Sequence, residues 1–235
     1  MIATKGLDAG YGKLQVLFDV NFKAEQGAIT AVVGPNGSGK STLLKAIAGI
    51  AKIFRGVVEI GGVDATRIAP HERARLGLAY LPQVKNVFQN LTVEENLRMA
   101  AYHLDSREYK ERLREILEVV PIGGLLHRRA LELSGGWRQM VAVAMALIRG
   151  AKYFMFDEPT AQLSPKFAEE VLNLVKKLAE MGYTVVLAEQ NAKKALEIAH
   201  SCYLLVSGKV AYEGPPSGLL ARADLAELYL GIKSI

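Results

Sequence analysis

Short apolar runs alternate with amphipathic stretches along most of the chain, which predicts an α/β fold with a largely parallel sheet. Runs rich in β-branched or aromatic residues predict buried strands at residues 28–33, 77–81, 153–156 and 184–188. Glycine-bounded runs at 14–22 and 56–60 predict shorter strands of an N-terminal antiparallel sheet. Near the C-terminus, Ser207-Gly208 separates two further runs, 203–206 and 210–213, and predicts a hairpin.

The pattern changes to that of an amphipathic helix between residues 93 and 120, where one face carries Leu113, Ile116, Leu117 and Val120. No strand pattern follows until residue 153, so residues from about 85 to 150 are expected to form a helical subdomain inserted into the α/β core. The whole chain, 1–235, is then expected to be one domain.

A later helix is predicted to begin at Pro165, with Ser164 as its N-cap, and to stop at Gly182.

Composition narrows the class of protein only a little. The longest apolar run, 140–148, is far shorter than the roughly 20 residues that cross a bilayer, and the first residues lack an apolar signal core. A soluble, cytoplasmic protein is therefore expected. The net charge of +5 could suit nucleic acid or a membrane surface, but basic and acidic residues are interspersed, which favours an ordinary mixed surface. The single cysteine, Cys202, lies in an apolar run and is expected to be a core residue.

One motif carries most of the chemistry. It follows the strand at 28–33, matches the phosphate-loop pattern G-x-x-x-x-G-K-[ST], and precedes apolar residues with helical spacing. Glycines let successive N–H groups turn toward phosphates, the lysine reaches the outer phosphates, and the serine suits Mg²⁺. The alternative is a glycine-rich turn that binds nothing. The motif comprises Gly34, Pro35, Asn36, Gly37, Ser38, Gly39, Lys40, Ser41 and Thr42.

Two adjacent carboxylates, Asp157 and Glu158, end the apolar strand at 153–156. Neighbouring strand residues point in opposite directions, so the two acids are expected to have different roles. Asp157 suits a partner of hydrated Mg²⁺, and Glu158 suits a base that orients an attacking water. Alone, such a pair is weak evidence. Behind a complete phosphate loop it supports hydrolysis of a nucleoside triphosphate.

A second candidate anion site is Leu133-Ser134-Gly135-Gly136, which runs into an apolar helix at 139–148. A hydroxyl, glycine N–H groups and a helix N-terminus all suit a phosphate, although an ordinary serine N-cap is the simpler alternative. With this tetrapeptide between the two nucleotide motifs, the chain resembles the ATP-binding cassette (ABC) family over essentially its whole length.

This resemblance implies a phosphate-loop core with an antiparallel subdomain and a helical subdomain. It implies that Tyr11 stacks on the adenine, that Gln83 reaches Mg²⁺ and the attacking water, and that residues 160–164 communicate across a dimer. Two subunits would pack head to tail, so that ATP in one phosphate loop is covered by the Ser134 segment of the other. Closure on ATP and reopening after hydrolysis would drive transmembrane permease subunits from the inner face of the membrane.

The chain departs from the family pattern at three positions. Trp137 replaces the common glutamine after Ser-Gly-Gly, where stacking or interface packing is expected. Ser164 replaces the usual aspartate of the dimer-communication loop. Gln190 replaces a histidine that contacts the terminal phosphate, and it can donate a hydrogen bond but not take up a proton near neutral pH. Slower or differently gated hydrolysis is therefore predicted.

Three segments resemble the subgroup that energises uptake of branched-chain amino acids: Glu189-Gln190-Asn191, residues 91–97, and Tyr229-Leu230-Gly231. Against this assignment, residues 82–85 are Pro-Gln-Val-Lys where the subgroup usually has Pro-Glu-Gly-Arg. The predicted partners are permease subunits, a second ABC ATPase that is either the same chain or a related one, and indirectly a substrate-binding protein.

A loop past Gln83 carries Phe88, Leu91 and Val93, which are predicted to dock a short permease helix; a small satellite core is the alternative.

Two other functions are compatible with a phosphate loop. A soluble ABC ATPase that acts on nucleic acid or ribosomes usually has two cassettes or a long inserted coiled coil, and neither pattern is present in the sequence. No nucleic-acid partner is therefore expected. A small-molecule kinase built on the same phosphate loop would leave residues 133–136 unexplained.

Overall fold

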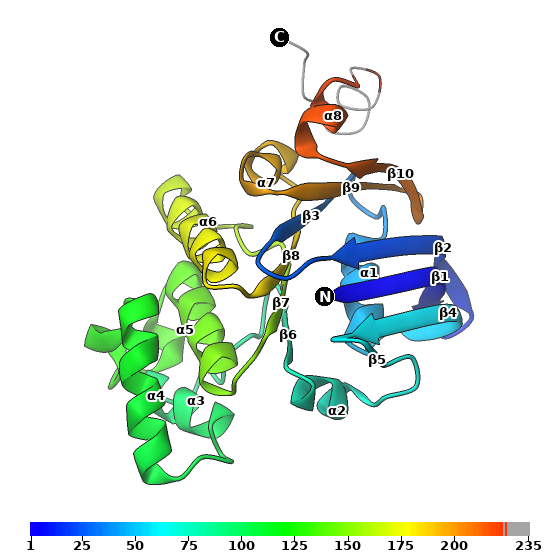
Figure 1. Ribbon diagram of the computed structural model, residues 1–235. Coiled ribbons are helices and arrows are strands. Elements are labelled where there is room, and N and C mark those ends of the chain that lie inside the picture. Colours follow the sequence, from blue (N-terminus) through cyan, green and yellow to red (C-terminus); the bar gives the residue numbers. More distant parts are fainter. Residues whose placement is uncertain (223, 225–235) are drawn as a thin grey trace. The chain divides into compact units, whose positions relative to one another are not determined.

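The computed structural model describes residues 1–222 and residue 224 (Figure 1). The chain divides into two compact units. The sheet unit comprises Met1–Tyr80, Lys152–Glu158 and the described residues from Leu178 onward, and the helical unit comprises Leu81–Ala151 and Pro159–Lys177. The segment Tyr229-Leu230-Gly231 lies outside the described residues.

An antiparallel sheet in the sheet unit has the strand order β2-β1-β4-β5. Its strands are β1 (Ile2–Tyr11), β2 (Leu14–Ala24), β4 (Lys52–Ile60) and β5 (Val63–Asp64). Leu17, Val20 and Phe22 of β2 are buried while residues between them reach solvent, as expected of a sheet with one covered face. β1 was not predicted from the sequence, and Tyr11 is its last residue.

The second sheet of the sheet unit has the order β10-β9-β3-β8-β7-β6. Its strands are β3 (Ile29–Val33), β6 (Leu78–Leu81), β7 (Tyr153–Asp157), β8 (Thr184–Ala188), β9 (Ser201–Val206) and β10 (Lys209–Gly214). β3 pairs in parallel with both β8 and β9, and β7 pairs in parallel with β8, whereas β9 and β10 form an antiparallel hairpin. Every residue of β3 and β8 is buried, which is why both strands are continuous apolar runs. The predicted α/β fold class is confirmed.

Helix α1 (Lys40–Ile47) contacts strands of both sheets. Its Leu43, Leu44 and Ile47 are fully buried in a core that also contains Leu17 of β2 and Val186 of β8. The packing of α1 therefore fixes the helix that follows the phosphate-loop motif. The remaining described helices of this unit are α2 (Pro70–Arg75), α7 (Ala192–Ile198) and α8 (Pro216–Leu220).

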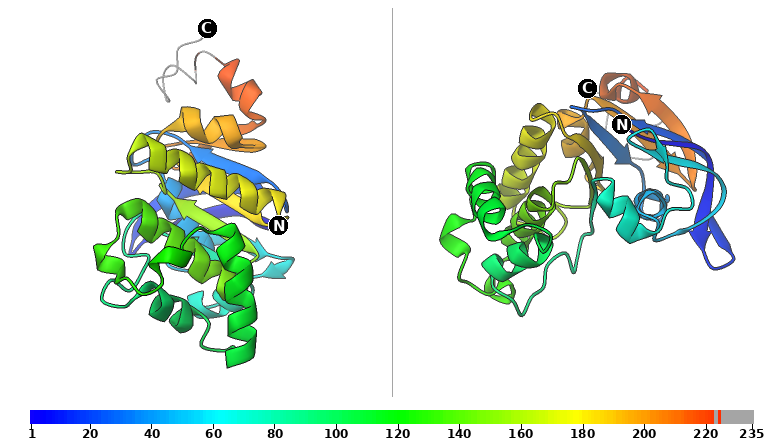
Figure 2. Two further views of the ribbon diagram at one scale, coloured as in Figure 1. Left: turned by 90° about the vertical axis from the view of Figure 1, so that its left-hand side faces the viewer. Right: turned by 60° about the horizontal axis from the view of Figure 1, so that its bottom comes forward.

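The helical unit contains α3 (Val93–Ala100), α4 (Ser106–Val119) and α5 (Gly135–Ile148), with short 3₁₀ turns at Gly123–Leu125 and Ala130–Glu132. Both α3 and α4 pack on α5 (Figure 2). Helix α6 (Pro165–Glu180) begins in this unit, and the Ser164 hydroxyl accepts a hydrogen bond from the Phe167 N–H at 3.4 Å, which confirms the predicted N-cap.

The single helix predicted between residues 93 and 120 is wrong, because the chain leaves the helical conformation at 101–105. The Asp105 carboxylate accepts hydrogen bonds from the N–H groups of Arg107 and Glu108 and starts a new helix. On α4 the predicted apolar face holds: Ile116 and the adjoining Val120 are buried.

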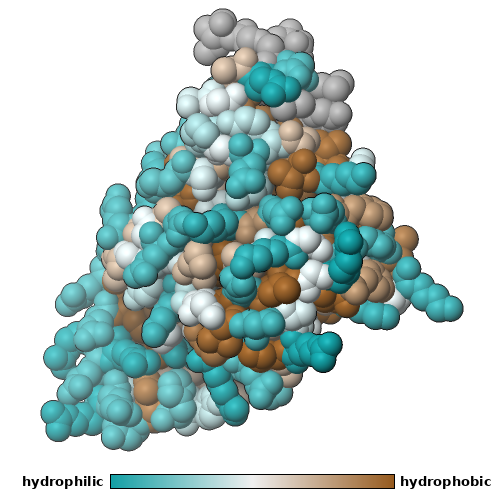
Figure 3. Space-filling model, turned by 45° about the vertical axis from the view of Figure 1, so that its right-hand side comes forward, coloured by the Kyte–Doolittle hydropathy of each residue, from teal (hydrophilic) through white to brown (hydrophobic). Residues whose placement is uncertain are grey.

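The surface that is drawn in Figure 3 mixes hydrophilic and hydrophobic side chains. Across residues 1–222 and 224, none of the helices combines the length and the apolar character that crossing a bilayer requires.

Candidate nucleotide-binding site

The phosphate loop connects the end of β3 to α1, and its glycines adopt backbone conformations that other residues rarely take. The φ angles are 148° at Gly34, 76° at Gly37 and 108° at Gly39. A Cβ atom on Gly34 would lie 2.2 Å from the Leu205 carbonyl oxygen, and one on Gly39 would lie 2.7 Å from the Leu17 side chain. The loop is therefore held closely against the surrounding strands, in a shape that these glycines permit.

Lys40, the first residue of α1, folds back over this loop. Its Nζ donates hydrogen bonds to the carbonyl oxygens of Gly34 at 2.9 Å and Pro35 at 3.2 Å, and lies 3.9 Å from Glu158 Oε1. Only 4% of the residue is exposed, and this burial lowers the pKa of Lys40, while the nearby carboxylate of Glu158 acts in the opposite direction. The ammonium is thus partly desolvated at the centre of the loop.

Both carboxylate oxygens of Asp157, at the end of β7, accept hydrogen bonds. The Ser41 hydroxyl donates to Oδ1 at 2.7 Å, and the Tyr80 hydroxyl donates to Oδ2 at 2.8 Å. Asp157 is only 5% exposed, and these two hydrogen bonds compensate its carboxylate for the loss of contact with water. Sequence reasoning paired Ser41 with Asp157 through their motifs but missed Tyr80, whose role depends on β6 lying beside β7.

Glu158 follows Asp157 in a strained backbone conformation. Its φ is 51°, and its N–H donates to the carbonyl of Ala188 at 2.8 Å. Its side chain is 20% exposed and lies beside Lys40, whereas that of Asp157 is directed to Ser41. The two acids therefore occupy different environments, one buried and fixed, the other in contact with solvent.

The residues present fit a triphosphate and a hard cation. The Ser38 hydroxyl is buried and has no hydrogen-bond partner among the described residues, so an anion in the loop could use it. A hydroxyl and a carboxylate, Ser41 and Asp157, are oxygen ligands of the kind that Mg²⁺ prefers, with water and substrate phosphates completing its shell. Within residues 1–222 and 224, no group of three or more His, Cys, Asp or Glu side chains forms an all-protein metal cage.

Two further predicted residues lie in the sheet unit. The hydroxyl of Tyr11 is 3.5 Å from Thr42 Oγ1 of α1, and 42% of Tyr11 is exposed. Gln190 is exposed just after β8, where its carbonyl accepts a hydrogen bond from Ala192 N–H at 2.9 Å. β8 lies between β3 and β7, the strands that lead to the phosphate loop and to Asp157.

The other predicted residues, Gln83, Ser134, Gly135 and Gly136, belong to the helical unit. Ser134 occupies the N-cap position of α5, but its side chain makes no capping hydrogen bond. The alternative of an ordinary serine cap is therefore not supported, and the exposed hydroxyl stands at the N-terminus of a 14-residue helix.

Gly136 and Trp137 have a packing role within this unit. A Cβ atom on Gly136 would lie 2.2 Å from the Phe167 ring, and the Trp137 ring packs edge-on against Phe167 with centroids 5.2 Å apart. Trp137 thus packs edge-on against α6 within the helical unit.

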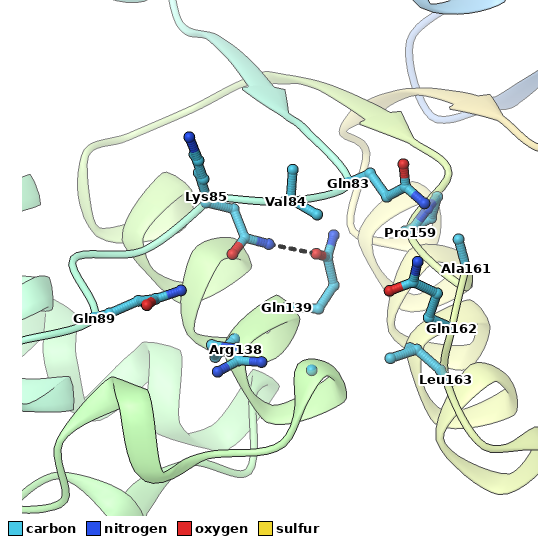
Figure 4. Close-up of a pocket in the computed structure, with 12 residues that line it drawn as sticks. Gln83, Val84, Lys85, Gln89, Arg138, Gln139, Pro159, Ala161, Gln162 and Leu163 are labelled. Atoms are coloured by element: carbon cyan, nitrogen blue, oxygen red, sulfur yellow. Dashed lines mark hydrogen bonds between the residues drawn. The ribbon is translucent and has the colours of Figure 1, made fainter.

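Gln83 and Gly135 line a pocket of about 240 Å³ in the helical unit (Figure 4). In Figure 4 the Gln139 amide lies between the segment with Lys85 and Gln89 and the segment from Pro159 to Leu163. Its oxygen accepts a hydrogen bond from Asn86 at 2.6 Å. The charged residues that line the pocket, Lys85 and Arg138, are both basic.

The loop predicted to dock a permease helix is only partly exposed. Phe88 is 52% exposed and Leu91 half-buried, but Val93 is fully buried at the start of α3. The assignment of Val93 to a docking surface is therefore wrong; it is a core residue. The Asn96 side chain fixes the loop by accepting from the N–H of Phe88 and donating to the carbonyls of Phe88 and Thr92.

A glycine-rich loop between β3 and α1, with a carboxylate pair at the end of β7 in the same sheet, defines a phosphate-loop nucleotide-binding protein. The family model described as ABC transporter matches residues 17–161. The chain belongs to this family, whose ATP-binding members hydrolyse ATP, and it is an ATPase.

Comparison with single proteins supports this assignment over nearly the whole chain. The chain is 51% identical to the probable branched-chain amino acid transport ATP-binding protein LivF of Archaeoglobus fulgidus, over 99% of each sequence. It is 33% identical to the high-affinity branched-chain amino acid transport ATP-binding protein BraG of Pseudomonas aeruginosa, over 98% of this chain and 100% of the relative. Among solved structures, a dimeric post-hydrolysis ATP-binding cassette bound to ADP and Pi matches with a TM-score of 0.80 and 27% identity, over 92% of this chain and 99% of that one.

Proposed function

We propose that this ATPase powers the import of branched-chain amino acids through a membrane permease. The observation that carries the energising role is the site in the sheet unit, where Lys40 and Glu158 lie 3.9 Å apart and Ser41 contacts Asp157 at 2.7 Å. The cargo rests on similarity to two relatives whose names specify branched-chain amino acid transport.

The phosphates of ATP bind along the loop from Gly34 to Thr42. Lys40 exchanges its hydrogen bonds with the Gly34 and Pro35 carbonyls for hydrogen bonds with the outer phosphates. The partly desolvated ammonium thereby replaces neutral acceptors with negatively charged ones, which form stronger hydrogen bonds. Ser41 and Asp157 would hold Mg²⁺, and the family resemblance makes Gln83 a further candidate ligand. When bound, Mg²⁺ neutralises charge on the phosphate oxygens.

Glu158 orients the attacking water and accepts its proton. Its position beside Lys40, together with its partial exposure, suits a group that must meet both water and the terminal phosphate. Gln190 donates a hydrogen bond to that phosphate without titrating, and Tyr11 stacks on the adenine.

Two subunits complete each site by packing head to tail. Ser134, Gly135 and Gly136 of one subunit cover the ATP held by the phosphate loop of the other. The uncapped Ser134 hydroxyl at the N-terminus of α5 supports this role, as does the similarity to a cassette of known dimeric structure. The second subunit is either another copy of this chain or a related ATPase.

Permease subunits bind the helical unit through the loop that carries Phe88 and hold the protein at the inner face of the membrane. A substrate-binding protein delivers the amino acid to the permease from the other side. The exposed Phe88 ring on a loop fixed by Asn96 supports this docking surface.

The decisive experiment is co-purification with candidate permease subunits, followed by ATPase assays of the reconstituted complex. Hydrolysis is expected to rise when the cognate binding protein is added with leucine, isoleucine or valine, and to stay at its basal rate with a charged amino acid as control. Absence of stimulation by all three branched-chain amino acids would remove the cargo assignment, while loss of co-purification would remove the partner.

A further inference from the structure

Tyr80 holds one oxygen of the Asp157 carboxylate, and the phosphate loop's serine holds the other. The Tyr80 hydroxyl donates to Oδ2 at 2.8 Å, and Ser41 donates to Oδ1 at 2.7 Å. Both carboxylate oxygens are therefore held by hydroxyl donors.

The two donors are not equivalent. Ser41 belongs to the phosphate loop and is itself a candidate Mg²⁺ ligand, so its bond to Asp157 must be exchanged when the cation arrives. Tyr80 comes from β6 and has no such second role. With Ser41 ligating the cation, the Tyr80 hydroxyl would still hold Oδ2 of the Asp157 carboxylate.

The hydrogen-bond chemistry makes Tyr80 the donor. An ionised carboxylate can only accept a hydrogen bond, so the 2.8 Å contact between the Tyr80 hydroxyl and Oδ2 of Asp157 has the phenol O–H as its donor. Asp157 is almost fully buried, and a carboxylate in such surroundings is oriented by its hydrogen-bond donors rather than by water.

We propose that Tyr80 is a positioning residue for the Mg²⁺ site, which acts by fixing the Asp157 carboxylate in the orientation that presents Oδ1 to the cation. This inference rests on the proposed function, since it takes Ser41 and Asp157 as the protein's Mg²⁺ ligands. A purely structural tyrosine would contribute to folding without altering the affinity for the cation.

The chain offers a matched control for this distinction. Tyr203 on β9 is also buried, and its hydroxyl donates to the Glu213 carboxylate at 2.7 Å. Tyr203→Phe therefore removes a tyrosine–carboxylate hydrogen bond of similar length from the same sheet, but this bond does not involve Asp157.

The test measures metal binding without turnover. Mn²⁺, the paramagnetic probe of the Mg²⁺ site, is titrated into the full chain with a non-hydrolysable ATP analogue and followed by electron paramagnetic resonance. Tyr80→Phe is expected to raise the apparent Kd for Mn²⁺ about tenfold, in the range typical for loss of a hydrogen bond to a metal ligand. Tyr203→Phe is expected to leave that Kd within twofold of the wild type.

A second measurement separates positioning from folding. Binding of the analogue in EDTA, which needs the phosphate loop but no cation, is expected to be the same for Tyr80→Phe and the wild type. At saturating Mg²⁺, kcat is expected to return to within twofold of the wild-type value.

A Mn²⁺ Kd of Tyr80→Phe within twofold of the wild type would overturn the inference, and so would parallel loss of metal-free nucleotide binding. Failure of the wild type itself to bind Mn²⁺ with the analogue would instead contradict the proposed Mg²⁺ site.

Discussion

At the scale of single residues, Asp157 and Glu158 differ in environment although they are neighbours in sequence. Replacing Glu158 by glutamine is expected to lower kcat for ATP hydrolysis at least about 100-fold, because an amide cannot accept the proton of the attacking water. Nucleotide affinity should stay near the wild-type value, which equilibrium binding would measure. Glu180→Gln, at an exposed acid at the end of α6, is the control. ATPase activity unchanged by Glu158→Gln would contradict the role of Glu158 as the base.

Cys202 gives a second prediction at this scale. The thiol is buried in β9, and burial raises its pKa to about 12 from an ordinary value of 9.0. A thiol reagent at pH 8 is therefore expected to modify the protein only after unfolding in urea. Because this is the only cysteine of the chain, the reaction reports on one site. Rapid labelling of the folded protein would show that β9 opens without global unfolding.

The pH dependence of stability follows from the same shift. Above pH 9 the unfolded thiol loses its proton while the folded thiol keeps it, so the unfolded state binds fewer protons and stability falls as pH rises. The slope from Cys202 alone is expected to approach about 1.4 kcal/mol per pH unit. Urea denaturation at pH 8 and pH 10 should show a smaller loss of stability for Cys202→Ala than for the wild type; equal losses would be inconsistent with the shift.

How far single residues are predictable depends on how local their chemistry is. Lys40 and Ser41 are specified by a motif whose members are consecutive, and the hairpin turn at Ser207-Gly208 is specified by its own sequence. Tyr80 is different, because its bond to Asp157 exists only once β6 and β7 are neighbours in the sheet. The prediction that Val93 belongs to a docking surface was wrong for a related reason. An apolar residue in a loop-like pattern is equally compatible with an exposed surface and with the core.

At the scale of elements, α1 is stabilised at its C-terminal end by a buried arginine from α2. Arg73 is 2% exposed, and its guanidinium donates to the carbonyls of Ala46 and Ile47, both at 2.7 Å, and to those of Ile68 and Thr66. These bonds place a positive charge at the negative end of the helix that begins with Lys40.

Arg73→Met is expected to lower the free energy of unfolding by about 3 kcal/mol, because buried helix carbonyls would lose their donors. Urea denaturation measures this loss. Arg75→Met is the control, since Arg75 is an exposed residue of the same helix, and its effect should stay within about 0.5 kcal/mol. Equal effects of the two substitutions would show that the bonds to α1 contribute no specific stability.

Elements were predictable where the hydrophobic pattern was simple. The wholly buried strands β3 and β8 are uninterrupted apolar runs, and the predicted runs match them closely. β1 escaped because Gly6 and Gly10 interrupt its pattern; at Gly10 a Cβ atom would lie 2.0 Å from the Leu14 carbonyl oxygen, so the neighbouring strand requires the glycine. The division between α3 and α4 was visible in Asp105 and Glu108, a capping box that argues against one continuous helix.

At the scale of the whole molecule, the exposed Phe88 ring provides a test of permease binding. Phe88→Glu is expected to abolish co-purification with permease subunits, because a carboxylate in an apolar contact would be buried without a partner. Nucleotide affinity should be unchanged. Lys110→Glu, an exposed substitution on α4, is the control for a change of charge alone. Loss of both permease and nucleotide binding by Phe88→Glu would favour a core role for this loop.

Pairing of two subunits on ATP is the step on which the proposed mechanism depends most, and Ser134 allows it to be tested. With Glu158→Gln slowing hydrolysis, the chain is expected to run as a dimer with ATP in size-exclusion chromatography with light scattering. Adding Ser134→Glu should keep it monomeric, because a carboxylate at the N-terminus of α5 repels the phosphates of the partner's ATP, while nucleotide affinity is retained. Ser106→Glu places the same charge at the N-terminus of α4, a helix of equal length in the same unit, and should leave pairing intact. Dimers that persist with Ser134→Glu would contradict head-to-tail pairing through this segment, whereas pairing only after a related ATPase is added would identify a heterodimer.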